Sequence, residues 1–263
     1  MTIACGFELT GVGFAYGEIQ ALAGLDISLA PGRFYGIVGP NGCGKTTFLD
    51  LLTGTKFPDQ GSITFMGQPV AGYRRRDLAR MVALVPQDFG IDFAFTVQEV
   101  VLMGRHPHIG RFASPAAEDW RQVDAAMEAI GISHFKDRFV NELSGGEKQR
   151  VVVARALAQQ TPYLLFDEAT SSLDVQYTMQ IFNVAKRLVQ EEGRTVIAVI
   201  HNLNLAAAYC DELIFMQKGK VAASGPTDTV LDPALIKKVF GVESRVAFDE
   251  FSNTQQISFR YWS

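Results

Sequence analysis

Short apolar segments recur along the chain, and each is followed by a turn and then by a longer segment of helical periodicity. This rhythm is typical of an α/β domain with a mostly parallel core sheet. Four apolar runs predict strands of that sheet, at residues 33–38, 81–85, 163–166 and 195–200. A polar group stands directly after each run, at the sheet edge where open α/β sheets bind their ligands.

Other parts of the chain follow different patterns. Alternation at 7–9 and 14–16 predicts an N-terminal antiparallel β subdomain, and the segment 214–221 predicts a hairpin. Helical signals replace strand signals between about 89 and 158, which predicts an inserted helical subdomain. We expect one domain over 1–263, with a short C-terminal tail at about 243–263.

Within the inserted subdomain, Ser114 and Pro115 predict the start of a helix, as a cap followed by proline at the first position. One face of that helix is predicted to pack in the core, and it carries Trp120, Val123, Met127 and Ile130.

The composition supports a globular protein and narrows its partners. Hydrophobic residues make up 48% of the chain and charged residues 20%, which suffices for a sizeable core. The formal charge of −4 argues against a nucleic-acid partner. Apolar runs fall far short of the roughly 20 residues that cross a bilayer, and the N-terminus lacks the pattern of a signal peptide, so we expect a soluble, unexported protein. Three widely spaced cysteines suit a reducing compartment.

One segment fits the phosphate-binding pattern G-x-x-x-x-G-K-[ST], and it consists of Gly39, Pro40, Asn41, Gly42, Cys43, Gly44, Lys45 and Thr46. It follows a predicted strand and precedes the helix-compatible segment 48–52, and we expect Thr47 to bind the nucleotide as well. Glycines let successive backbone N–H groups turn onto phosphate oxygens. We expect Lys45 to reach the β- and γ-phosphates and the hydroxyl of Thr46 to bind Mg²⁺. Cys43 is expected to be a small filler of the loop.

Two acidic residues end the apolar run at 163–166. Asp167 and Glu168 should emerge at the same sheet edge as the phosphate loop. We expect Asp167 to hold the Mg²⁺ shell and Glu168 to polarise an attacking water.

A second candidate anion site opens the predicted helix at 148–158. Ser144 can cap this helix, and Gly145 and Gly146 permit close approach of the backbone. The exposed N–H groups and the helix dipole together favour an anion. The chain already has one complete phosphate-binding loop, so a second anion site requires an explanation.

The order of these motifs resembles the ATPase subunit of an ABC transporter over nearly the whole chain. The resemblance rests on the phosphate loop, Gln87, residues 143–147, residues 165–168, residues 171–174 and His201. It implies a P-loop NTPase (RecA-like) fold with ATP and Mg²⁺. It also implies a head-to-tail homodimer in which Ser144, Gly145 and Gly146 of one subunit close over ATP held by the other.

The resemblance further implies roles for four residues. Tyr16 occupies the place of an aromatic that stacks on adenine, and Gln87 that of a glutamine contacting Mg²⁺ or the attacking water. Asp174 resembles a residue that crosses the dimer interface, and His201 a histidine that contacts the γ-phosphate.

Two positions depart from the family pattern. Ala169 stands where a proline is usual, and Asn202 where an aspartate is common. We expect them to tune the rate of hydrolysis rather than to abolish it.

The segment 104–108, Gly-Arg-His-Pro-His, is similar to ATPases that drive importers of iron-siderophores, haem, cobalamin and related metal chelates. This implies that transmembrane permease subunits dock between Phe89 and Arg111, that a periplasmic or extracellular binding protein is an indirect partner, and that the chain lies at the cytoplasmic face of the inner membrane. His106 and His108 lack a third ligand nearby and are expected to serve structure or docking. The 62 residues after His201 are too few for the regulatory barrel of sugar-importer ATPases.

Two alternatives remain open from the sequence. One is a soluble, non-transport ABC ATPase that acts on the ribosome or DNA, although such proteins usually carry two ATPase halves, a coiled-coil insertion or a basic arm. The other is a nucleotide-dependent switch that hardly hydrolyses ATP, against which Glu168 and His201 both argue.

Overall fold

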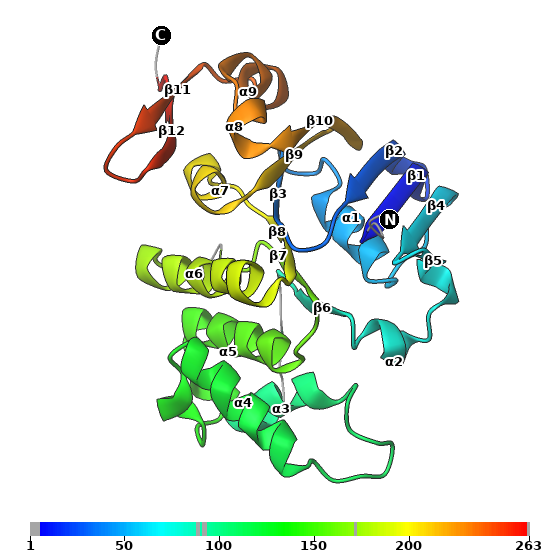
Figure 1. The fold of residues 1–263 in the computed structure, drawn as a ribbon, viewed down its shortest axis with the longest axis vertical. Helices are drawn as coiled ribbons and strands as arrows, with labels where there is room; N and C mark the ends of the chain where they lie inside the picture. The colour runs from blue at the N-terminus through cyan, green and yellow to red at the C-terminus, as the bar shows by residue number, and fades with distance from the viewer. Residues whose placement is uncertain (1–5, 88–89, 91–93, 171–172, 262–263) are drawn as a thin grey trace. The chain divides into compact units, whose positions relative to one another are not determined.

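The computed structural model describes residues 6–87, 90, 94–170 and 173–261. The chain forms two compact units, the first from residues 1–73 with 197–263 and the second from residues 74–196. Each unit is built around its own strands and helices (Figure 1).

An antiparallel sheet opens the first unit. It has the order β2-β1-β4-β5, from strands β1 (Phe7–Tyr16), β2 (Ile19–Leu29), β4 (Gln60–Phe65) and β5 (Gln68–Pro69). The rings of Phe7 and Phe65 stack with centroids 4.4 Å apart. The antiparallel subdomain is therefore confirmed. The predicted strands at 7–9 and 14–16 are one strand, because irregularities in pairing between Leu9 and Phe14 interrupt the alternation without ending the strand.

The first unit also holds largely buried strands in the order β10-β9-β3-β8, namely β3 (Phe34–Val38), β8 (Thr195–Val199), β9 (Glu212–Gln217) and β10 (Lys220–Pro226). Strand β8 carries the chain into this unit from the second. Strands β3 and β9 are parallel, and β9 and β10 form the predicted hairpin. Every residue of β3 and β8 is buried, which explains their continuous apolar runs.

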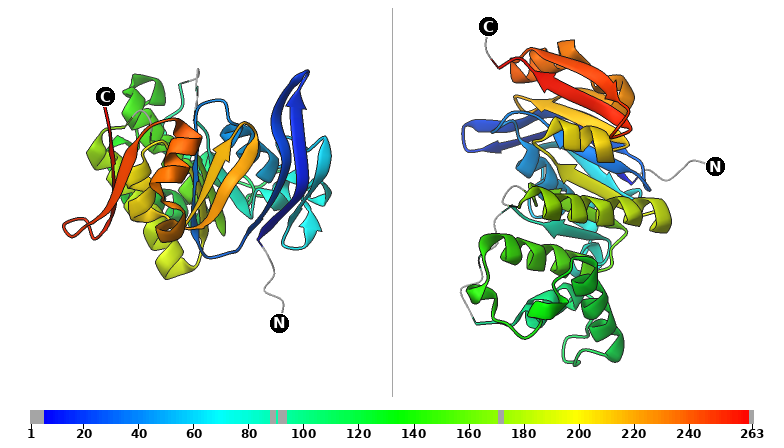
Figure 2. Two further views of the ribbon diagram at one scale, coloured as in Figure 1. Left: turned by 90° about the horizontal axis from the view of Figure 1, so that it is seen from above. Right: turned by 90° about the vertical axis from the view of Figure 1, so that its left-hand side faces the viewer.

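Among the described residues, the α-helices of the first unit are α1 (Lys45–Leu52), α7 (Leu203–Tyr209), α8 (Thr227–Val230) and α9 (Pro233–Phe240). The predicted tail forms a hairpin of β11 (Ser244–Asp249) and β12 (Thr254–Phe259), drawn in red in Figure 2. The Asn204 side chain fixes it to α7, since its Oδ1 accepts from the N–H of Ile257 at 2.6 Å and its Nδ2 donates to the same residue's carbonyl at 3.3 Å.

In the second unit, the described residues form a parallel pair of strands and several helices. Strands β6 (Val82–Val85) and β7 (Tyr163–Asp167) pair in register, with Val85 opposite Phe166. The helices are α2 (Arg75–Leu78), α3 (Val97–Leu102), α4 (Ala117–Ala129), α5 (Gly145–Ala158) and α6 (Val175–Glu192). Helix α5 packs against α3 and α4 (Figure 1). The parallel pairs in both units confirm the predicted core, and the helices confirm the inserted helical segment.

The predicted start of α4 is wrong by about two residues. The helix begins at Ala117, because the Asp119 carboxylate accepts the N–H of Ala116 at 2.9 Å and closes the N-terminus without Ser114. On the predicted core face Val123, Met127 and Ile130 are buried, but Trp120 is 38% exposed.

Among the described helices, we find none with both the length and the apolar character that crossing a membrane requires.

Candidate functional site

The phosphate loop lies between β3 and α1 in the first unit. Helix α1 has Gly44 as its N-cap, with φ of +103°, and no side chain caps it. An L-residue rarely adopts this conformation, and a Cβ at Gly44 would lie 2.6 Å from the carbonyl oxygen of Ala21. A helix start without a side-chain cap offers its backbone donors and dipole to an anion.

Gly39 is required for a different reason. A Cβ there would lie 2.2 Å from the carbonyl oxygen of Met216 and 2.8 Å from the Sγ of Cys43. The loop can therefore approach the end of β9 only where no side chain intervenes.

Lys45 folds over the loop to which it belongs. It is 5% exposed, and its ammonium donates to the carbonyls of Gly39 at 3.1 Å and Pro40 at 3.2 Å. The neighbouring Cys43 is buried, and burial raises the pKa of its thiol although Lys45 acts in the opposite direction. A buried neutral thiol fits the expected filler and not a nucleophile.

Tyr16 is held next to α1. Its hydroxyl lies 3.3 Å from the Oγ1 of Thr47, and the ammonium of Lys56 lies 5.3 Å from its ring centroid. The side chain remains 47% exposed, so an aromatic surface stands beside the start of the helix.

His201 follows β8 and is exposed. The N–H of Ile200 donates to the carbonyl of Ile37 at 3.0 Å, which brings His201 to the strand end where the phosphate loop begins. Asn202 is the N-cap of α7, and its side chain accepts from the N–H groups of Asn204 and Leu205 at 2.9 and 3.2 Å. Asparagine and aspartate cap helices equally well, so this departure from the family pattern keeps the cap of α7.

The acidic pair lies in the second unit, at the end of β7. Asp167 is 5% exposed, and Glu168 has a left-handed backbone with φ of +51°. The Nε2 of Gln87 donates to the Oε2 of Glu168 at 2.9 Å. Parallel pairing of β6 and β7 thus brings Gln87 and Glu168 together. Ala169 is buried directly after them.

Each unit carries side chains with the oxygen atoms that Mg²⁺ prefers as ligands. The first unit has the hydroxyl of Thr46, and the second has the carboxylate of Asp167 and the amide carbonyl of Gln87. Because the Nε2 of Gln87 donates to Glu168, the carbonyl oxygen of Gln87 is the atom left to coordinate a cation.

Ser144 is the N-cap of α5, as predicted, and its helix begins at Gly145. The Oε2 of Glu147 accepts from both the N–H and the hydroxyl of Ser144 at 2.7 Å, and the N–H of Glu147 donates to the Ser144 oxygen at 3.4 Å. This is a complete capping box. The hydrogen bonds from the Ser144 hydroxyl and N–H lower the pKa of Glu147.

Asp174 caps α6, where its Oδ1 accepts the N–H of Tyr177 at 3.0 Å. The sequence interpretation missed a contact between α6 and α5: the guanidinium carbon of Arg150 lies 3.9 Å from the ring centroid of Tyr177. Arg150 is 5% exposed. The position of Arg150 shortly after residues 143–147 could have indicated a functional role for it. No sequence pattern indicated Tyr177 as its partner.

Part of the predicted site lies outside the described residues, namely Ser171, Ser172 and Phe89. The first unit brings together the phosphate loop, Tyr16, Thr47 and His201. The second unit holds Gln87, Asp167, Glu168, Ser144 to Gly146, and Asp174.

Comparisons with known proteins give one consistent result. The family model described as "ABC transporter" matches residues 22–171. The "Cobalamin import ATP-binding protein BtuD" of Halobacterium salinarum is 41% identical over 92% of this chain and 60% of its own length, so the chain spans about three fifths of that relative. The "Ferric enterobactin transport ATP-binding protein FepC" of Escherichia coli is 35% identical over 91% of this chain and 88% of its own. The solved structure described as "An inward-facing conformation of a putative metal-chelate type ABC transporter" is 29% identical, with a TM-score of 0.83 and 98% of both chains covered.

Proposed function

The chain belongs to the ABC transporter family, and on that premise we propose that it is the ATP-binding subunit of an importer for a metal chelate such as an iron-siderophore, haem or cobalamin. The observation that carries this proposal is the similarity to chelate-import ATP-binding proteins over about nine tenths of the chain. The segment 104–108, singled out in the sequence, supports the same class.

We propose the following roles in ATP hydrolysis. The uncapped start of α1 binds the phosphates, Lys45 neutralises the charge on their oxygens, and Tyr16 stacks on the adenine. Thr46, Gln87 and Asp167 would hold Mg²⁺, which supplies charge neutralisation at the phosphate oxygens. Glu168, oriented by its hydrogen bond from Gln87, takes the proton of the attacking water, and His201 contacts the γ-phosphate.

The second anion site implies a second copy of the chain. Ser144, Gly145 and Gly146 stand at an exposed helix start, and we propose that they close over ATP held by the partner copy while Asp174 crosses the interface. Transmembrane permease subunits, docking between Phe89 and Arg111, would hold the chain at the cytoplasmic face of the inner membrane. A binding protein on the far side of the membrane would deliver the chelate.

Replacement of Glu168 by glutamine tests the catalytic proposal. The hydrogen-bonding shape is kept but the base is lost, so we expect hydrolysis to fall about 10²- to 10⁴-fold while ATP binding persists. Size-exclusion chromatography with ATP and Mg²⁺ should then show a trapped dimer, and the rate of the natural chain should rise more than linearly with its concentration. Glu128→Gln, at an exposed position of α4, serves as the matched control. Normal hydrolysis by Glu168→Gln would refute the role, and a lasting monomer would refute the shared site.

The substrate class needs a separate test in cells. A strain lacking this chain should lose uptake of one radiolabelled iron chelate, haem or cobalamin, and the natural gene should restore it where Glu168→Gln does not. Undiminished uptake of every chelate tested would contradict the import proposal without touching the ATPase.

A further inference from the structure

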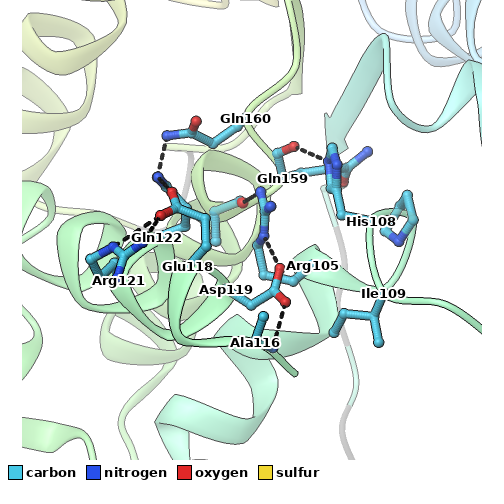
Figure 3. A network of polar contacts seen from close by, with 12 residues as sticks. Arg105, His108, Ile109, Ala116, Glu118, Asp119, Arg121, Gln122, Gln159 and Gln160 are labelled. Carbon is cyan, nitrogen blue, oxygen red and sulfur yellow. Dashed lines mark hydrogen bonds and ion pairs between the residues drawn. The ribbon is translucent and has the colours of Figure 1, made fainter. Parts of the chain in front are cut away.

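The segment Gly104 to His108 packs against the C-terminal end of α5, the helix that Ser144 caps. Figure 3 shows Arg105 and His108 of this segment beside Gln159. At Gly104 the two backbones meet, because a Cβ there would lie 2.1 Å from the carbonyl oxygen of Arg155. Any side chain at Gly104 would push the segment away from the helix.

Arg105 makes the central contact. Its Nη1 donates to the carbonyl of Ala158, the last residue of α5, at 2.8 Å, and its Nε donates to the Oδ1 of Asp119 at 3.0 Å. Arg105 and Asp119 are 6% and 7% exposed. The other oxygen of Asp119 accepts the N–H of Ala116 at the start of α4. A buried cation thus neutralises the negative end of the α5 dipole and ties α5 to α4.

His108 adds a second contact at the same helix end. Its Nε2 lies 2.9 Å from the carbonyl oxygen of Gln159. A carbonyl only accepts, so the Nε2 carries the proton and donates. Burial lowers the pKa of His108, although its hydrogen bond to Gln159 acts in the opposite direction. The side chain of Gln159 in turn donates to the carbonyl of Val82 at 3.1 Å.

Hydrogen bonds from the α2 region and within the segment itself fix the backbone of 104–108. The carbonyl of Pro107 accepts from the Nε of Arg76 at 2.8 Å and from the Nε of Arg80 at 2.9 Å. The N–H of His108 donates to the carbonyl of Arg105 at 2.8 Å. Phe112 lies after these hydrogen-bonded residues and is 96% exposed.

The Ser144 cap and the contacts of the 104–108 segment lie at opposite ends of the same helix, α5. Helix α5 has 14 residues, which corresponds to a rod about 21 Å long at 1.5 Å per residue. Ser144 caps its first turn, and the 104–108 segment holds its last turn. A displacement of one end must therefore move the other, provided that the clamp at the last turn stays closed.

We propose that Arg105, His108 and Asp119 are positioning residues that join the segment 104–109 to α5 as one rigid body, so that ATP engagement at Ser144 to Gly146 is transmitted to the face offered to the permease. This inference rests on the proposed function, since it assumes that ATP engages Ser144 to Gly146. In this proposal the Gly-Arg-His-Pro-His segment holds the C-terminal end of α5, and its histidines need not bind a metal.

Hydrogen exchange on the full chain tests the clamp without a permease. In the Glu168→Gln background, ATP with Mg²⁺ should slow exchange of the first amides of α5, at 145–148, and also those of His108 and Ile109 at the other end. We expect about a tenfold slowing at both ends. His108→Leu removes the donor to Gln159 and should abolish the ATP-dependent slowing at 108–109 while sparing 145–148. His108→Gln, which retains a donor, should restore it.

The matched control and a second variant keep the test decisive. Arg121→Gln breaks the exposed ion pair with Glu118 on the same helix as Asp119 and should leave both ends responsive. If His108→Leu unfolds, Asp119→Asn removes the charge that faces Arg105 at nearly constant shape and should likewise uncouple the ends. The clamp proposal would be overturned if ATP slowed exchange only at 145–148 in the Glu168→Gln chain, or if the slowing at 108–109 persisted in His108→Leu and Asp119→Asn. Either result would leave the proposed function standing. No slowing at 145–148 would overturn both.

Discussion

The chain contains two helix starts proposed to face the same phosphates, and they are built in opposite ways. Helix α1 begins at Gly44 with no side-chain cap. Helix α5 begins at Ser144 with a complete capping box, in which Glu147 accepts from both the N–H and the hydroxyl of Ser144. The first start leaves its helix end to a ligand, whereas the second satisfies its own end with a carboxylate.

This difference suggests an order of events. A phosphate can occupy the start of α1 without opening a capping box. Contact with the Ser144 hydroxyl requires that hydroxyl to leave Glu147, whose charge also opposes a phosphate. The first site should therefore bind ATP within one chain, and the second should contribute only when a closed dimer offsets that loss.

Helix α3 provides an internal standard for the comparison. Thr96 and Glu99 form the same box, with the Oε2 of Glu99 accepting from the N–H and hydroxyl of Thr96 at 2.8 Å. No nucleotide role is proposed there. Variants of the two boxes can thus separate the capping of a helix from the binding of a phosphate.

The largest expected effect is at the open start, with Lys45→Met. Removal of the buried ammonium that lies over the carbonyls of Gly39 and Pro40 should lower ATP hydrolysis by about 10²- to 10³-fold. Calorimetric titration with ATP and a steady-state ATPase assay measure the change. Lys220→Met, at an exposed position of β10, is the control. Hydrolysis that survives in Lys45→Met would show that the open start is not the primary phosphate site.

A smaller effect is expected from Ser144→Ala, compared with Thr96→Ala. Each loses a cap and should lose about 1 kcal/mol in the free energy of unfolding. Ser144→Ala should in addition weaken the ATP-driven dimer of Glu168→Gln about tenfold, since one hydrogen bond to a charged group is lost. Denaturant titration and analytical ultracentrifugation give the two quantities. Equal dimerisation by both variants would reduce Ser144 to a helix cap.

The sequence predicted the open start better than the closed one, for a physical reason. The phosphate loop is specified by eight consecutive residues, and the strand directly before it, β3, is a continuous apolar run. These signals are local. The capping serine was also recognised, but competition from Glu147 for its hydroxyl was not, because a motif gives the residue types and not their hydrogen-bond partners.

Contacts between distant residues were the main omissions. The Arg105–Asp119 pair joins a turn to another helix, and the Arg150–Tyr177 contact joins two helices. No periodicity encodes such pairs. The wrong start of α4 has a different, local origin, since Asp119, three residues away, accepts the N–H of Ala116 where Ser114 and Pro115 gave the stronger signal.

The smallest and most specific effect should come from Glu147→Gln. The amide keeps an acceptor for Ser144 but removes the charge, so we expect the ATP-driven dimer of Glu168→Gln to tighten about threefold, a modest electrostatic effect at a solvated site. Glu99→Gln, in the matching box of α3, should leave the dimer unchanged.

Acid titration sharpens the same comparison. Hydrogen bonds from Thr96 and Ser144 hold the pKa values of Glu99 and Glu147 below the ordinary 4.5. A carboxylate whose pKa is lower in the folded than in the unfolded chain stabilises the fold above the unfolded value, and that stability is lost as the pH falls through the folded value. Unfolding measured below pH 4.5 should therefore show a shallower acid loss in both Glu147→Gln and Glu99→Gln than in the natural chain. If Glu147→Gln shows this shallower acid loss but weakens the ATP-driven dimer, the carboxylate of Glu147 favours ATP binding. The starts of α1 and α5 would then differ in their capping geometry but not in their ability to bind a phosphate.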